Sequence, residues 1–165
     1  MQVQVRKARE RDIPQLWQLM KELAVFEGYI EDFAITTQII LEKGFRKAPP
    51  DFHCLVAEDL QSSKLVGMVV YYFLPYTARN RPTMFLKELY VAPEYRGKKI
   101  GNALMQRVAK EAVLHNCYTI RWLVAPWNGA AVRFYERMGA SEDRSWLNFE
   151  WTEEQFSLAA SKAPA

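Results

Sequence analysis

The 165-residue chain lacks a long apolar segment. No run approaches the roughly 20 apolar residues that cross a bilayer. The first residues, MQVQVRKARERD, also lack the apolar stretch of a signal peptide. The sequence therefore predicts a cytoplasmic protein that has no membrane partner.

An excess of charge of one sign is also missing. The chain carries 22 Lys and Arg against 19 Asp and Glu, which gives a formal net charge of +3. Nucleic-acid binding normally goes with a larger basic excess. A basic patch around Arg79, Arg81 and Lys87 is thus the less favoured interpretation, and we expect no nucleic-acid partner.

Cysteine is scarce, and neither of the two cysteines belongs to a CxxC motif. Cys54 and Cys117 lie in apolar runs, where inert buried thiols are the expected state. A disulfide or a nucleophilic cysteine is the less favoured alternative. Neither His53 nor His115 has a neighbouring ligand at a spacing typical of metal sites, so no metal is predicted.

What the chain does contain is an ordered series of strand-like and helix-like segments. Hydrophobic alternation predicts strands at residues 3–8, 52–58, 64–73, 84–91, 118–125 and 145–151. Helical spacing predicts helices after Asp12, from Thr36 or Thr37 to Gly44, over 99–116, and from Asn128 to Gly139. This order predicts one α/β domain over residues 1–157, with a mixed central sheet flanked by helices, and a disordered tail over 158–165.

The most informative stretch is EYRGKKIG, residues 94–101, between a predicted strand and a predicted helix. The first N–H groups of a helix have no partners within the helix and favour an anion. Glycines allow the backbone to approach a phosphate closely, and Arg96, Lys98 and Lys99 add positive charge. The segment fits neither the Walker loop nor the dinucleotide fingerprint. A phosphate cradle and a solvated basic turn remain equally possible from this segment alone.

A second segment, LVAPWNGAAVRFYERMGA, favours the phosphate cradle. Asn128 and Tyr135 lie seven residues apart, which is two helical turns, so they share nearly one face of a helix. Taken separately, Asn128 is a simple helix cap and Tyr135 is a core aromatic residue beside Phe134. Their order after the basic turn and one intervening strand points to a more specific pattern.

Together these segments resemble the GNAT superfamily of acetyl-CoA-dependent N-acetyltransferases. The superfamily pattern is a strand, R/Q-x-x-G-x-G/A, a helix, a further strand, and a helix with Asn near its start and Tyr two turns later. This chain has LYVAPEYRGKKIGNAL and then VAPWNGAAVRFYERMGA. KELAVFE, FHCLVAE and LVGMVVYYF further resemble the diamine (spermidine/spermine) acetyltransferase branch, over about residues 3–156. The resemblance implies direct attack of an amine on acetyl-CoA in a ternary complex, and a homodimer that exchanges C-terminal segments.

The resemblance also implies a role for individual residues. Tyr135 corresponds to the general acid at the departing sulfur, and Glu88, or a water molecule that it holds, is the candidate base. If side chains alternate strictly, Glu88 lies on the strand face opposite Lys87 and Leu89. The residues expected to bind acetyl-CoA are Leu89, Tyr90, Val91, Arg96, Gly97, Lys98, Lys99, Ile100, Gly101, Asn102, Asn128 and Ala131. Backbone N–H groups near Tyr90 and Val91 are expected to face the thioester and the pantetheine amides.

Two departures from the family pattern concern the cofactor and the acceptor. Lys99 stands where the family usually has a glycine, and Lys87 stands where the polyamine enzymes often have an acidic residue. Phe26, Glu27 and Lys87 are the expected substrate contacts. We expect an amine shorter than spermine, either a diamine or a diamino acid such as thialysine, lysine or ornithine. An acetyltransferase for another amine class and a silent acyl-CoA-binding module are the alternatives.

Overall fold

The computed structural model describes residues 2–162. Its strands are β1 (Val3–Lys7), β2 (His53–Asp59), β3 (Lys64–Leu74), β4 (Thr83–Val91) and β5 (Thr119–Trp122). Its α-helices are α1 (Ile13–Glu27), α2 (Thr37–Ile40), α3 (Ile100–Leu114), α4 (Gly129–Arg137) and α5 (Glu153–Ser161). A π-helical segment, Leu41–Arg46, continues α2. Short 3₁₀ turns cover Glu10–Asp12, Ile30–Asp32, Thr77–Arg79 and Pro93–Tyr95.

The five strands form one mixed sheet in the order β1-β2-β3-β4-β5. The first four strands pair antiparallel with one another, and β5 is parallel to β4. The turn expected between β2 and β3 is present, and the Asp59 carboxylate accepts hydrogen bonds from the backbone of Gln61 and the hydroxyl of Ser62. The predicted fold class, α/β with a mixed central sheet flanked by helices, is confirmed.

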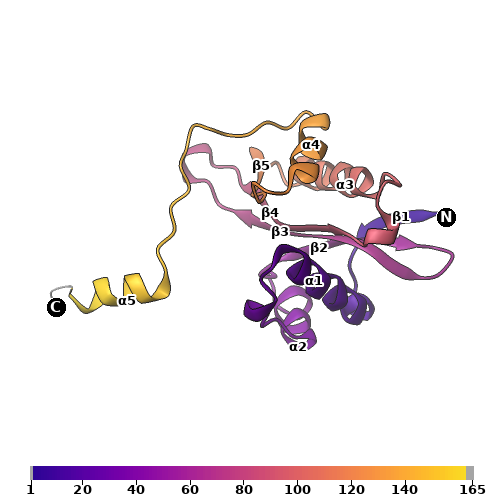
Figure 1. The fold of residues 1–165 in the computed structure, drawn as a ribbon, viewed down its shortest axis with the longest axis horizontal. Helices are drawn as coiled ribbons and strands as arrows, with labels where there is room; N and C mark the ends of the chain where they lie inside the picture. The colour runs from indigo at the N-terminus through magenta and orange to yellow at the C-terminus, as the bar shows by residue number, and fades with distance from the viewer. Residues whose placement is uncertain (1, 163–165) are drawn as a thin grey trace. The chain divides into compact units, whose positions relative to one another are not determined.

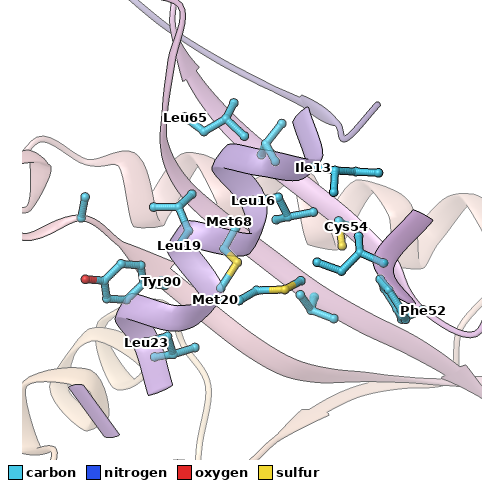
Figure 2. Close-up of a cluster of buried hydrophobic side chains, with 14 residues drawn as sticks. Ile13, Leu16, Leu19, Met20, Leu23, Phe52, Cys54, Leu65, Met68 and Tyr90 are labelled. Carbon is cyan, nitrogen blue, oxygen red and sulfur yellow. The ribbon is translucent and has the colours of Figure 1, made fainter. Parts of the chain in front are cut away.

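Helices cover both faces of this sheet. α1 and α2 lie on one face, and α3 lies on the other (Figure 1). The apolar stripe of α1 packs on the sheet, as Figure 2 shows for Leu16, Met20 and Leu23 against Met68 and Tyr90. This packing fixes the end of α1 close to the middle strands.

The start of α1 differs in one detail from the expectation. Asp12 stands at the N-terminus of α1, but its side chain caps no helix N–H. Its two carboxylate oxygens instead accept hydrogen bonds of 2.6 and 2.9 Å from the Arg6 guanidinium. The backbone N–H of Arg9 donates a further bond of 2.7 Å to this carboxylate. The Asp12 carboxylate thus pairs with the Arg6 guanidinium and not with a helix N–H. This charge pair links β1 to the start of α1.

The chain divides into two compact units, the first ending at Leu123 and the second beginning at Val124. In the second unit, Asn128 caps α4 as predicted, because its side-chain oxygen accepts a hydrogen bond of 3.2 Å from the Ala131 N–H. Gly139 follows the end of α4 with a φ of 87°, which is the left-handed conformation expected of a glycine stop.

The predicted strand at residues 145–151 is wrong for this chain. The segment between α4 and α5 contains neither helix nor strand. Alternating apolar residues favour pairing, but a strand forms only where another strand accepts its backbone hydrogen bonds. Residues 158–161 of the expected tail form the end of α5, and residues 163–165 lie outside the described part of the chain. The domain boundary at residue 157 stays a prediction.

Among residues 2–162, no helix is both long enough and apolar enough to cross a membrane.

Candidate active site

The candidate active site begins with an irregularity in β4. Val70 of β3 pairs with Glu88, whereas the next residue, Tyr71, pairs with Leu86. Lys87 is therefore the extra residue of a β-bulge and has no partner on β3. Because paired residues of antiparallel strands point to the same side, the bulge turns Glu88 to the face opposite Leu86.

Glu88 thus faces the α1 side of the sheet, where Val70 and Tyr90 contribute to the core. The Glu88 side chain is half-buried, and its Oε2 atom is shielded from solvent and accepts no hydrogen bond within the described residues. Burial raises the pKa of this carboxyl to about 7, with a smaller increase from Glu27, and Lys87 lowers it. A carboxyl with a pKa near neutrality can accept and return a proton at neutral pH.

Three further polar residues surround Glu88. The pKa of Glu27, the last residue of α1, is raised by burial and lowered by Lys87. The pKa of the Tyr29 phenol is raised by burial and by the charges of Glu88 and Glu27. These mutual effects show that Glu27, Tyr29, Lys87 and Glu88 form one electrostatically coupled cluster. We call these four residues the acceptor cluster.

The basic turn lies between β4 and α3, as the sequence predicts. Gly97 has a φ of +74°, and a Cβ placed on it would meet no atom within 4 Å, so the space beside it is open. Lys99 directly precedes α3 with a left-handed φ of 61°. The chain adopts there the conformation that glycine prefers, although the residue is lysine. The turn therefore presents the first N–H groups of α3 beside an open space, and that arrangement suits a phosphate. We call residues 94–101 the phosphate-type turn.

Arg96 connects this turn to α1 and β4. Its Nε atom donates a 2.9 Å hydrogen bond to the carbonyl oxygen of Val91. Its guanidinium carbon lies 5.0 Å from the ring centre of Phe26 and 5.5 Å from that of Tyr90. By contrast, the Lys98 ammonium donates to the Glu94 carbonyl oxygen at 3.0 Å, within the turn. Arg96 thus holds the end of α1, which carries Glu27, against the phosphate-type turn.

The backbone of β4 has an open edge beside this turn. β5 pairs only with Thr83–Leu86, so no strand of the described sheet covers that edge from Lys87 to Val91. On the other edge, the Ala92 N–H donates to Val66 of β3. Hydrogen bonding alternates along an antiparallel pair, so the backbone groups of Tyr90 face β3, and those of Leu89 and Val91 face the open edge.

The remaining predicted residues lie in the second unit, on α4. Asn128 and Ala131 share the capping hydrogen bond, so the side-chain oxygen of Asn128 is engaged with its own helix. The ring centres of Tyr135 and Phe134 lie 5.2 Å apart. This contact is the one expected if Tyr135 is a core aromatic residue beside Phe134. In the described chain, no group of three or more His, Cys, Asp and Glu residues is arranged to hold a metal ion. Cys54 and Cys117 are free thiols.

A mixed sheet with a bulged strand, a half-buried carboxyl and a basic turn at a helix N-terminus suits a protein that transfers a group from a phosphate-bearing donor. Comparison with known proteins identifies the family. The model of the acetyltransferase (GNAT) family matches residues 13–140. This chain therefore belongs to the GNAT acetyltransferase family.

Individual relatives agree with this assignment. The chain is 36% identical to a mouse thialysine N-epsilon-acetyltransferase over 158 residues, which cover 89% of this chain and 91% of the mouse protein. It is 34% identical to human spermidine/spermine N(1)-acetyltransferase-like protein 1, over 92% of this chain and 23% of that longer protein. Among solved structures, an integron cassette protein from V. cholerae matches with a TM-score of 0.78 at 23% identity, over 98% of this chain and 99% of that one.

The structure brings together Phe26, Glu27, Lys87, Glu88 and Arg96, which the sequence placed in two separate segments. Sequence reasoning missed Tyr29 and the stacking of Arg96 on Phe26. Neither has a sequence signal, because both depend on how the end of α1 meets β4.

Proposed function

We propose that this protein transfers the acetyl group of acetyl-CoA to a primary amine of a small molecule. The acceptor classes are a diamine, a polyamine, or a diamino acid such as thialysine, lysine or ornithine. The single observation that carries the proposal is Glu88, a shielded carboxyl with a pKa near 7 on the bulged strand beside a phosphate-type turn. The names of the mouse and human relatives, which include thialysine and spermidine/spermine acetyltransferase, support the acceptor class.

In this proposal, Glu88 removes the proton from the acceptor ammonium, directly or through a water molecule. The neutral nitrogen attacks the thioester carbon in a ternary complex, a C–N bond forms, and the C–S bond breaks. Tyr135 donates a proton to the departing thiolate, and the second proton that the nitrogen loses as the amide forms passes to solvent, from which the Tyr135 phenolate is reprotonated. No acetyl-enzyme forms, so neither cysteine takes part. Burial raises the pKa of the Cys54 thiol, which makes it a poor nucleophile.

Main-chain groups hold acetyl-CoA in this proposal. Residues 97–102 take the pyrophosphate, and Arg96, Lys98 and Lys99 supply positive charge around it. The open edge of β4, toward which the backbone groups of Leu89 and Val91 point, faces the thioester and the pantetheine amides, whereas the backbone of Tyr90 faces β3. On α4, Asn128 and Ala131 contact the pantetheine arm. The open space at Gly97 and the start of α3 support this assignment.

We also propose a homodimer that exchanges its C-terminal segments. Trp146, Leu147, Phe149 and Trp151 are between 64% and 87% exposed, and exposed apolar groups of this size mark an interaction surface. β5 is an edge strand, and edge strands accept further strands. The alternating segment 145–151, which forms no strand in the structure, can pair with a second copy. The two free thiols agree with the reducing cytoplasm, where we place the protein.

The test is the release of free thiol from acetyl-CoA across a panel of amines. Turnover with small primary amines is the expected result. A protein that binds CoA, seen as a thermal shift, but turns over none of the amines would instead be a silent acyl-CoA-binding module.

A further inference from the structure

Lys87 is an unusual residue for a site that must accept a cationic amine. It stands in the acceptor cluster with Glu27, Tyr29 and Glu88, and like charges in a binding site repel a cationic ligand. The bulge fixes this position, because Lys87 is the one residue of β4 between Leu86 and Glu88 that has no partner on β3. A cation that is held beside the base by backbone geometry needs a function that outweighs the repulsion.

The Lys87 side chain is exposed and available. Its ammonium forms no hydrogen bond or ion pair within residues 2–162, although the charge of Glu27 is near enough to interact with it. The cluster therefore presents a cation and an anion side by side, without a closed ion pair between them. Such an arrangement matches a ligand that carries an ammonium and a carboxylate on the same carbon atom.

Glu27 is held in place from the opposite side. The neighbouring Phe26 lies under the Arg96 guanidinium at 5.0 Å, and Gly28 ends α1 in the left-handed conformation. The Glu27 carboxylate is therefore presented from a fixed helix end. Lys87 comes from the bulged strand, so the two charges belong to two anchored elements.

We propose that Lys87 binds the α-carboxylate of the acceptor, with Glu27 binding its α-ammonium, so that this enzyme selects amino acids that bear a side-chain amine over diamines and polyamines. The inference rests on the proposed acetyl transfer and adds the charge pattern of the substrate. The zwitterionic end of the acceptor lies between Lys87 and Glu27, and its distal amine reaches Glu88. A long polyamine has no carboxylate for Lys87 and places a cation beside it.

The experiment uses acceptor pairs that differ only by the carboxylate. Lysine is compared with 1,5-diaminopentane, and ornithine with 1,4-diaminobutane. The measured quantity is kcat/KM for each acceptor, in the wild type and in the variants Lys87→Gln, Lys87→Glu and Lys87→Arg. We expect the wild type to prefer the amino acid of each pair. Lys87→Gln should lower this preference by up to about fivefold, the equivalent of one solvent-exposed ion pair. Lys87→Glu should reverse it by improving the diamines, and Lys87→Arg should retain it. Lys110→Gln removes an exposed cation from α3 and should change nothing.

Three other outcomes overturn the inference. If all variants turn over both members of a pair with an unchanged ratio, Lys87 does not bind the carboxylate. If Lys87→Gln moves the pH profile of kcat but leaves the ratio unchanged, Lys87 acts on the Glu88 proton and not on the acceptor. If the wild type prefers the diamines, the charge pattern is misassigned. An absence of turnover with every amine would instead remove the proposed acetyl transfer itself.

Discussion

Glu88 faces Val70 across β3 and β4, while the preceding pair joins Leu86 to Tyr71. This single skipped residue, Lys87, decides which side of the sheet receives the carboxyl. In a regular strand, Glu88 would share a face with Leu86. The bulge instead places it on the α1 side with Glu27 and Tyr29.

Replacing Glu88 by Gln should remove the base with little change in shape. We expect kcat to fall by about 10²-fold or more, within the range for positioned proton transfer. In the wild type, kcat/KM should rise with pH through an inflection near 7, because the raised pKa keeps Glu88 protonated below that pH. The variant should lack this inflection. Glu42→Gln, on an exposed carboxylate, is the matched control. Wild-type turnover in Glu88→Gln would exclude Glu88 as the base.

The same residue should make folding stability depend on pH. A carboxyl whose pKa is higher in the folded chain binds its proton more tightly there, so the free energy of unfolding falls as the pH rises from about 4.5 to about 7. Between pH 4.5 and 8, Glu88→Gln should therefore gain up to about 3 kcal/mol relative to the wild type. Urea unfolding at both pH values measures the difference. A difference that is the same at both pH values contradicts the buried state of this carboxyl.

Gly97 should control CoA binding through charge. CoA protects a protein that binds it against thermal unfolding by mass action. Gly97→Asp places a carboxylate at the open side of the turn and should abolish the thermal shift. Gly97→Asn has the same size and also tolerates the left-handed φ of +74°, so it controls for shape and should retain part of the shift. If CoA shifts both variants as much as the wild type, the turn does not bind phosphate.

The general-acid role of Tyr135 can be separated from its packing. Tyr135→Phe keeps the ring beside Phe134 and removes only the hydroxyl. We expect turnover to fall by around 10²-fold, with CoA affinity nearly unchanged in calorimetry. Phe134→Leu tests the packing alone and should affect stability more than turnover. Equal turnover in Tyr135→Phe would leave Tyr135 as a structural aromatic residue.

The oligomeric state can be measured directly. Light scattering at micromolar concentration should give the mass of a dimer, twice the 19.2 kDa of the chain. Ending the chain after Asp143 removes the exposed aromatic residues and should give a monomer. A full-length protein that scatters as a monomer would refute the exchange of C-terminal segments.

Much of this architecture follows from local patterns in the sequence. Alternation in the first strand and short apolar runs in the others identify all five strands, and Asn128 and Gly139 mark the limits of α4 because capping chemistry is local. The basic turn is also evident, since the Arg, Gly and Lys residues that shape it are contiguous.

The remaining features depend on long-range pairing. The bulge at Lys87 arises from the register with β3, and alternation along β4 contains no sign of it. Arg96 stacks on Phe26, seventy positions earlier in the chain, only because α1 packs on the sheet. The aromatic alternation at 145–151 was misjudged for a related reason, since the pattern describes an ability to pair and not the presence of a partner.

The short length of β5 has a consequence for how the protein can evolve. From Lys87 to Val91, no strand of the described sheet pairs with this edge of β4 beside the phosphate-type turn. A ligand arm that carries amides can lie along such an edge like an additional strand, and main-chain groups recognise it whatever the side chains are. If the proposed donor binds along this edge, substitutions at side-chain positions such as Lys87 should change the acceptor without changing donor affinity. Donor recognition and acceptor choice would then depend on different atoms of the same strand.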